Sequence, residues 1–268
     1  MPIITLTSDW QNDSIYLAVI KGFILKNSPT SQIIDLNHKI SFMNIGEAAF
    51  VIRNSYKQFP DGTVHIIAVN SEATENQKHL IVEANNQYFI SNDNGIFNLI
   101  FEEPVDNIIE IKNTETTSPT FPELEIFAKT ACDIANGKNI LEIGKKMSKF
   151  NKFFPLLAYS EEDVIEGKII FIDNYQNLIT NITKELFENM RKGRNFEITL
   201  KSIKHKIKII SENYNEIEEG ELLAVFNYFG YLELAQAKGR LAELLQVSVK
   251  DTVRVKFGVK SNDLKMKN

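Results

Sequence analysis

The sequence is poor in the residues that build metal centres and covalent crosslinks. Its 268 residues include one cysteine and four histidines. A single thiol excludes an internal disulfide and a thiolate metal site. The histidines lack the short spacings of ligand pairs, so no metal site is predicted; they are His38, His65, His79 and His205. We expect His65, inside an apolar β run, to be a packed or edge histidine, and Cys132, in an apolar helical pattern, to be a buried structural thiol.

The chain also lacks a long hydrophobic run and a large charge excess. No segment approaches the ~18 uninterrupted apolar residues of a membrane span, and no basic leader precedes an apolar stretch. Acidic and basic residues are interspersed, with a formal net charge of −5, which is not the footprint of a polyanion-binding protein. We expect a soluble, cytoplasmic protein that binds neither membranes nor nucleic acid.

Three common motifs are missing as well. There is no Gly-x-Gly-x-x-Gly after a strand, no Gly-x-x-x-x-Gly-Lys phosphate loop and no Gly-x-Ser-x-Gly elbow. A dinucleotide fold, a P-loop nucleotide site and an α/β-hydrolase nucleophile therefore have no support. No bound cofactor is predicted.

What is present in the first half is an alternation of apolar β runs with helical patterns. The predicted elements are strands at 3–7, 32–36 and 63–69 and helices at 14–26, 44–58 and 122–136. Such alternation is typical of βαβ units. Two further β runs flank Asn85-Asn86 and predict a hairpin. We therefore predict an N-terminal α/β domain with a mainly parallel sheet over residues 1–160.

The second half contains short β runs separated by turn residues. They lie at 168–173, 195–200, 204–210, 221–226, 231–235 and 252–257. This spacing predicts a smaller, antiparallel, β-barrel-like C-terminal domain over residues 161–268. Between the halves, from 136 to 166, the pattern weakens into a Lys-rich and then acidic stretch, which we interpret as the connection between the domains.

Asp9 directly follows the first predicted strand. A carboxylate at the carboxyl end of a parallel strand faces the crevice where α/β sheets bind ligands, and there it can accept hydrogen bonds from ribose hydroxyls. The alternative is that Asp9 caps the next helix. Asp93-Asn94-Gly95 is similarly ambiguous, and a turn that starts a short helix at 96–100 is the favoured interpretation.

Asp173 follows another apolar β run, Lys168 to Ile172, and an alternating pattern resumes at Leu178 to Ile182. Taken alone, this is an ordinary hairpin, because turns favour Asp and Asn. The rest of the chain gives this carboxylate a second interpretation.

Several motifs, in order and nearly end to end, resemble one family. They are Ile4-Thr5-Leu6-Thr7-Ser8-Asp9, Lys21-Gly22-Phe23, Ile33-Ile34-Asp35-Leu36-Asn37-His38, Ala48-Ala49-Phe50, Phe59-Pro60-Asp61-Gly62-Thr63-Val64-His65, Asp93-Asn94-Gly95, the Asp173 to Ile182 stretch, and Gly230-Tyr231-Leu232-Glu233-Leu234-Ala235. The chain resembles the S-adenosylmethionine (SAM) hydroxide adenosyltransferases, or SAM hydrolases, which are similar in fold to the SAM-dependent fluorinases and chlorinases.

The resemblance implies a homotrimer with a SAM or adenosine site between neighbouring subunits. By position, Asp9 would take the ribose hydroxyls and Asp173 would meet the ammonium of the methionine part, as a carboxylate suits. Asn177 and Tyr175 would contact the nucleoside end, and Met43 would pack against the ligand.

The departures from the family concern the residues that handle water and the methionine carboxylate. The family's Asp, Arg and His triad is replaced by Asn70, Gln77 and Pro122, none of which accepts a proton near neutral pH. Tyr228 and Phe229 stand where relatives place a serine beside a glycine. Glu72 and Lys78 are close in sequence and could substitute for the triad.

The family reaction is an in-line displacement at the ribose C5′ in which water replaces methionine, giving adenosine. A missing base costs on the order of 100- to 10,000-fold in rate. We therefore expect SAM or adenosine binding with weak or altered hydrolysis, and we assign no catalytic residue. One alternative is halide-dependent adenosyl transfer in a neutral pocket near Asn70, Ser71 and Thr74. The other is a non-catalytic binding or structural trimer.

Overall fold

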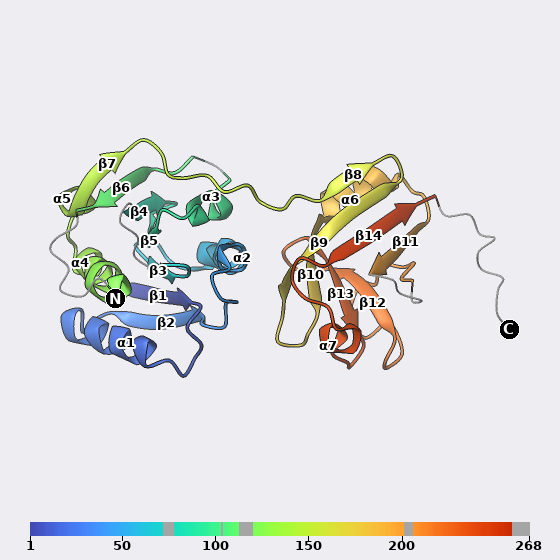
Figure 1. The fold of residues 1–268 in the computed structure, drawn as a ribbon, viewed down its shortest axis with the longest axis horizontal. Helices are drawn as coiled ribbons and strands as arrows, with labels where there is room; N and C mark the ends of the chain where they lie inside the picture. The colour runs from blue at the N-terminus through green and yellow to red at the C-terminus, as the bar shows by residue number, and fades with distance from the viewer. Residues whose placement is uncertain (72–77, 103, 113–119, 201–205, 259–268) are drawn as a thin grey trace. The chain divides into compact units, whose positions relative to one another are not determined.

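The computed structural model describes residues 1–71, 78–102, 104–112, 120–200 and 206–258. The chain forms two compact units, residues 1–155 and 156–268 (Figure 1). The division falls after Pro155, whereas composition predicted a boundary near residue 160. Each unit has its own sheet and its own apolar core.

The first unit alternates strands and helices along most of its length. Its elements are β1 (Ile3–Ser8), α1 (Ile15–Asn27), β2 (Gln32–Asn37), α2 (Ile45–Ser55), η1 (Tyr56–Gln58), β3 (Val64–Ala68), β4 (His79–Ala84), β5 (Gln87–Asn92), α3 (Ile96–Ile100), β6 (Asn107–Ile111), the π-helix η2 (Glu123–Ala128), α4 (Lys129–Ala135), α5 (Ile140–Ile143) and β7 (Gly144–Met147). The predicted strands, helices and Asn85-Asn86 hairpin of this half are confirmed.

The sheet of the first unit has the strand order β2-β1-β3-β5-β4-β6-β7. Strands β2, β1, β3 and β5 run parallel, and β4, β6 and β7 add an antiparallel edge. One core packs α1, η2 and α4 against the sheet, and a second packs α2 and α3. Helices therefore cover both faces of the sheet, which is why every residue of β3 is buried.

The second unit is built around an antiparallel sheet. Its elements are β8 (Tyr159–Glu161), β9 (Val164–Ile172), β10 (Leu178–Thr183), α6 (Lys184–Arg191), β11 (Phe196–Leu200), β12 (Leu222–Phe226), β13 (Tyr231–Gln236), α7 (Leu241–Leu245) and β14 (Thr252–Phe257). The strand order is β11-β14-β9-β10-β13-β12, with β8 on β9, and the sheet curls into a half-barrel. Phe187 of α6 fills it, with ring centroids 5.1 Å from Phe196 and 5.4 Å from Phe257.

These arrangements confirm the predicted α/β class with an antiparallel, barrel-like second part. Two local predictions were wrong. The described part of the run at 204–210 makes only isolated bridges, at Ile207 and Ile210. The stretch at 136–166 is not merely a connection, since it contains α5, β7, β8 and the start of β9. Strand β7 carries little apolar signal because it is an edge strand, and Gly144 lets it approach β6: a Cβ there would lie 2.2 Å from the Glu110 carbonyl oxygen.

Candidate functional site

Asp9 lies just after β1, and its carboxylate joins two loops that are distant in sequence. Its Oδ2 accepts the N–H of Met43 at 3.0 Å and that of Asn70 at 3.4 Å. Both partners have positive φ, 56° and 50°, which costs a non-glycine residue on the order of 1 kcal/mol. Helix α1 is capped by Ser14, whose hydroxyl accepts the N–H of Tyr16. The helix-cap interpretation of Asp9 is therefore wrong, and the carboxylate instead joins the loops that carry Met43 and Asn70.

The loop that carries Asn70 is held by asparagine side chains from the end of β5. The Nδ2 atoms of Asn92 and Asn94 donate to the Asn70 carbonyl at 2.9 and 3.2 Å. Asn94 Oδ1 accepts the N–H of Ile96, and Gly95, with φ of 94°, precedes α3. The predicted turn is confirmed, and its side chains also fix the backbone beside Asp9.

A buried carboxylate reaches this loop from the start of η2. The Ser71 hydroxyl donates a hydrogen bond to Glu123 Oε1, and both side chains are buried. Pro122, predicted from the resemblance to replace the family's histidine, is the N-cap residue of η2 and cannot take or give a proton. Glu123 was not predicted as a site residue, because an acidic residue in the first turn of a helix is ordinary there.

Three aromatic side chains adjoin these carboxylates in the chain. The Trp10 ring lies 6.2 Å from Tyr16 and 5.8 Å from Phe121, and Tyr16 and Phe121 are 5.0 Å apart, all between ring centroids. Trp10 follows Asp9, and Phe121 comes two residues before Glu123. The cluster therefore fixes the start of α1 against the segment that leads into η2.

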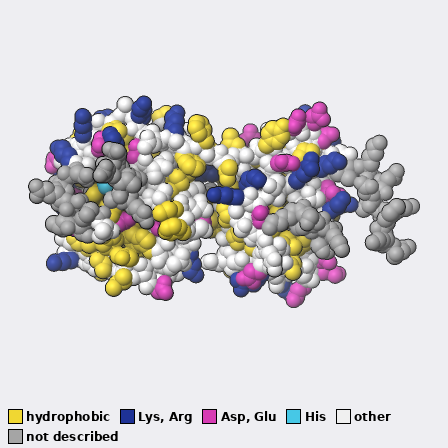
Figure 2. Space-filling model, viewed as in Figure 1, with side chains coloured by type: hydrophobic (Ala, Val, Ile, Leu, Met, Phe, Trp, Pro, Cys, Tyr) yellow, Lys and Arg dark blue, Asp and Glu magenta, His cyan; other side chains and the backbone are white. Residues whose placement is uncertain are grey.

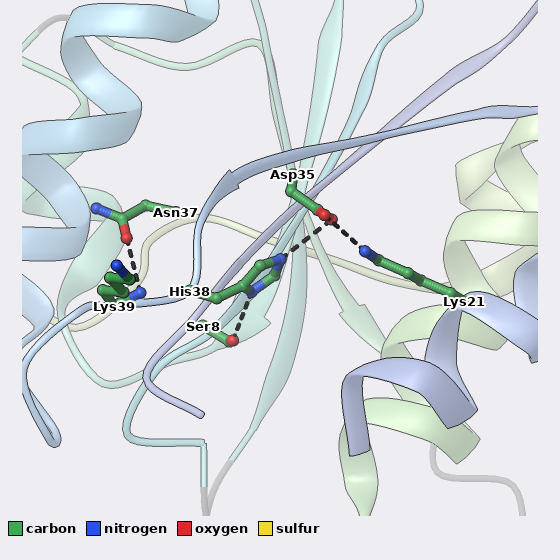
Figure 3. Close-up of polar contacts among 6 residues, drawn as sticks. All are labelled: Ser8, Lys21, Asp35, Asn37, His38 and Lys39. Carbon is green, nitrogen blue, oxygen red and sulfur yellow. Dashed lines mark hydrogen bonds and ion pairs between the residues drawn. The ribbon is translucent and has the colours of Figure 1, made fainter. Parts of the chain in front are cut away.

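A polar chain ties the end of β1 to β2 (Figure 3). Ser8 Oγ lies 2.7 Å from His38 Nδ1, and His38 Nε2 lies 3.1 Å from Asp35 Oδ1, at an angle too poor for a hydrogen bond. Lys21 Nζ donates to Asp35 Oδ2 at 2.6 Å. Burial raises the pKa of the Asp35 carboxyl, but the hydrogen bond from Lys21 and the nearby His38 ring outweigh it and lower that pKa overall.

The chain of contacts has the residue types of a Ser-His-Asp triad but lacks its hydrogen bonding, because His38 Nε2 makes no hydrogen bond to Asp35. Ser8 and His38 are only 2% and 3% exposed. We interpret the array as a support that fixes Ser8, and through it the neighbouring Asp9, at the end of β1.

One of the two residues proposed as substitutes for the triad, Lys78, is paired with another side chain. Lys78 Nζ pairs with Glu110 Oε2 at 3.0 Å, on a partly exposed surface. Gln77, Glu72 and Thr74 lie outside the described residues.

His65 and Cys132 are structural. His65 is packed inside β3, bonded to Thr5 Oγ1 and Gln87 Oε1, each at 2.7 Å, and stacked on Phe89. Burial lowers its pKa to about 4 despite the Gln87 hydrogen bond. Cys132 is buried as predicted, and burial, with Asp133 beside it, raises the pKa of its thiol to about 11. In the described ranges, no three His, Cys, Asp or Glu side chains converge as metal ligands.

In the second unit, Asp173 belongs to the hairpin between β9 and β10. Its Oδ1 accepts the N–H of Asn177 at 2.8 Å, and its Oδ2 accepts Asn177 Nδ2 at 3.2 Å. Gln176, with φ of 66°, completes the turn by donating to the Asp173 carbonyl. Tyr175 is 77% exposed. The ordinary hairpin is therefore confirmed as local structure, and it leaves one aromatic ring uncovered next to the carboxylate.

Tyr228 and Phe229 lie in a different loop, the turn between β12 and β13. Asn227 Oδ1 accepts the N–H groups of Phe229 and Tyr231, both at 3.1 Å, and Tyr228 is 89% exposed. In the β10/β13 pairing, Leu178 faces Leu234 and Thr183 faces Tyr231. The Asp173 turn and the Tyr228 turn therefore flank opposite ends of β10, and the residues predicted in this unit fall into two groups.

One open groove lies away from all of these residues. It has a volume of about 570 Å³, and its lining includes Pro2, Gly62, Gly137 and Lys138. Pro2 and Gly62 precede β1 and β3, so the groove is at the amino ends of the parallel strands, the end opposite Asp9. Ligands of open α/β sheets bind at the carboxyl ends, and for that reason we place the candidate site at Asp9.

On the face shown in Figure 2, neither positive nor negative charge dominates, because Lys and Arg side chains are interspersed with Asp and Glu. None of the helices in the described ranges is long and apolar enough to cross a membrane.

The fold is thus that of a two-part α/β and β-barrel-like protein with a carboxylate at the carboxyl end of its first parallel strand. The model of the SAM hydroxide adenosyltransferase N-terminal domain matches residues 4–144, and that of the C-terminal domain matches residues 167–254. Together these matches cover most of the chain, which belongs to the SAM hydroxide adenosyltransferase family.

Named relatives and a solved structure agree with this assignment. An (R)-S-adenosyl-L-methionine hydrolase of Methanocaldococcus jannaschii is 27% identical, covering 95% of this chain and 96% of its own. A fluorinase of Actinopolyspora mzabensis is 24% identical, covering 95% and 97%. A crystal structure of an uncharacterized conserved protein from Thermotoga maritima superposes with a TM-score of 0.85 at 25% identity, covering 94% of this chain and 99% of that one.

Proposed function

We propose that this protein binds SAM or adenosine and transfers the adenosyl group to water slowly. The observation that carries the proposal is the Asp9 carboxylate, which stands at the carboxyl end of β1 and collects the backbone of Met43 and Asn70 around it. A carboxylate fixed in this way can accept hydrogen bonds from two vicinal ribose hydroxyls, and charge-assisted bonds of this kind are the strong ones. Met43 then borders the ligand, and Asn70 forms the floor beside it.

The methionine part would be recognised by the second unit. Asp173 is half-buried and holds Asn177 against it, so its carboxylate is ordered before any ligand arrives. An ammonium is the natural partner of such a group. Tyr175, exposed in the same turn, offers a ring to the nucleoside. We assign Tyr228 and Phe229 to the methionine carboxylate end only by resemblance.

Hydrolysis would be slow because the proton acceptor of the family triad is gone. Asn70 and Pro122 have no basic atom to offer, so water must be activated in another way. The halide alternative is disfavoured, because the Ser71 hydroxyl already donates to the Glu123 carboxylate and an anion would be repelled there.

As the resemblance implies, we further propose a cytoplasmic homotrimer with sites between subunits. Light scattering checks the assembly, and the expected mass is about three times the 30.6 kDa of one chain.

Titration calorimetry with SAM and with adenosine, together with an assay for adenosine release, tests this function. We expect binding of both ligands and slow turnover. The triple variant Asn70→Asp, Gln77→Arg, Pro122→His should be faster by on the order of 100-fold or more. An absence of heat from either ligand at millimolar concentration would favour the purely structural trimer and would refute the proposal. Fast hydrolysis by the unchanged protein, not exceeded by the triple variant, would refute the slow-turnover part.

A further inference from the structure

Glu123 is a buried carboxylate that neither the family triad nor the proposed ligand contacts use. It is 6% exposed, and the side chain that donates to it, Ser71, is 4% exposed. Burying a charged carboxylate is costly unless it is hydrogen-bonded. A glutamate in the first turn of a helix usually lies in solvent, where its charge stays hydrated and no desolvation cost arises. The fold therefore bears a cost to place this carboxylate where it is.

The contact made by the Glu123 side chain indicates its role. Glu123 reaches Ser71, which lies 52 residues earlier in the loop that follows β3. Ser71 follows Asn70, whose N–H contacts Asp9. The contacts thus run from Asp9 through the Asn70-Ser71 backbone to Glu123, and they bring the start of η2 to the strand ends.

The segment that presents Glu123 is also unusual. Residues Glu123–Ala128 form a π-helix that continues into α4, and π-helical turns are rare and occur frequently at functional sites. Its first residue follows Pro122, which stands where the family has its histidine. A carboxylate has thus been placed one residue away from the position at which the family's base has been lost.

We propose that Glu123 accepts the proton of the attacking water through the Ser71 hydroxyl, and so takes over the role of the missing triad. This inference rests on the proposed function. In the step, the water oxygen forms a bond to C5′ of SAM while the C5′–S bond breaks, and its electron pair stays on sulfur as neutral methionine. The water proton passes to Ser71 Oγ as the Ser71 proton passes to Glu123. Glu123 then releases that proton to solvent, which restores the starting state.

The test compares Glu123→Gln with the wild type and with Glu142→Gln, a matched loss of one exposed carboxylate on α5. Glutamine keeps the shape and can still accept the Ser71 hydrogen bond, but it cannot take a proton. We expect kcat for adenosine release to fall on the order of 100-fold, while the affinity for SAM stays within about threefold. The rise of log kcat with pH on the acid side should vanish in Glu123→Gln and persist in Glu142→Gln.

A Ser71→Ala variant provides the second measurement, since it removes the relay and leaves the carboxylate. It should also lower kcat by on the order of 100-fold without loss of SAM binding. This variant decides the question if Glu123→Gln does not fold: a lowered kcat with retained binding supports the relay, and an unchanged kcat overturns it.

The outcomes separate the relay from the function on which it rests. If the wild type releases adenosine and Glu123→Gln keeps its kcat and pH profile, the relay is wrong and the proposed function stands. If the wild type binds SAM but releases no adenosine, the relay is wrong and only binding stands. If the wild type binds neither SAM nor adenosine, the proposed function fails and the relay fails with it.

Discussion

Asp9 and Asp173, the two carboxylates assigned to the ligand, are supported in opposite ways. Asp9, in the first unit, accepts N–H groups from residues 34 and 61 positions away in the chain. Asp173, in the second unit, is held by Asn177, four residues along its own hairpin. The first carboxylate depends on the assembly of the parallel sheet, and the second depends on one turn.

The same contrast extends to the interiors of the two units. The described residues of the first unit bury many polar side chains, among them His38, His65, His79 and Glu123, whereas those of the second bury few, such as Glu233 and Asn177. Buried polar groups need partners, and in the first unit the partners come from distant strands. The first unit should therefore respond more strongly to pH and to the loss of one polar side chain.

The largest expected effect is the loss of stability of the first unit in acid. The folded-state pKa of His65, about 4, lies below its unfolded value of 6.5. Between these values the unfolded chain binds a proton that the folded chain does not, so stability falls as pH drops from 6.5 to 4, by about 3 kcal/mol in total. The pKa of His79 is lowered by burial and acts in the same direction. Amide exchange at pH 7 and at about pH 5 measures the effect.

In that experiment β3 should lose protection in acid while β9 keeps it. A His65→Gln variant should be less stable at neutral pH and should show a flatter dependence on pH. An equal loss of amide protection in β3 and β9 would contradict the expectation that the first unit responds more strongly to pH.

Next in size is the effect of Asp9→Asn on ligand binding. The substitution keeps the shape and one acceptor, but it removes the charge that strengthens bonds to ribose hydroxyls. We expect the Kd for SAM and for adenosine to rise about 100-fold each. Calorimetry measures both, with the exposed Asp13→Asn as the control. A change for one ligand only would contradict the ribose assignment.

Asp173→Asn tests the second carboxylate, because Asp173 is assigned to the methionine part of SAM, which adenosine lacks. We expect the Kd for SAM to rise about 30-fold and the Kd for adenosine to stay the same, since one charge-assisted contact is lost. Glu185→Gln, also in the second unit, controls for the loss of a carboxylate. An equal loss of affinity for adenosine would place Asp173 elsewhere on the ligand.

The smallest effect is expected at Asn70, whose contact with Asp9 comes from the backbone. Asn70→Gly keeps the N–H and tolerates the positive φ, so the Kd for SAM should change by less than about threefold. Asn70→Ala should lower the free energy of unfolding by about 1 kcal/mol, because alanine is strained in this conformation. Urea unfolding and calorimetry check both. If Asn70→Gly binds as poorly as Asp9→Asn, the side chain itself contacts the ligand.

Local patterns in the sequence predicted most of the fold. The helix predicted at 44–58 is present as α2, and it buries one apolar face, formed by Ile45, Ala48, Ala49 and Ile52. The hairpin at Asn85-Asn86 and the buried Cys132 were also correct. These features depend on periodicity and turn preference, which act over a few residues. Strand β7 and helix α5 were missed because pairing at an exposed sheet edge leaves little apolar signal.

By itself the sequence determined the order of the elements and the family, because both can be recognised from residue types and their spacing. Only the tertiary structure decided where side chains distant in the chain converge. It placed Asp9 under the backbone of Met43 and Asn70, and it brought Glu123 to Ser71 across 52 residues. The reason is physical: strand pairing and helix packing set these distances, and neither is encoded in a short segment of the chain.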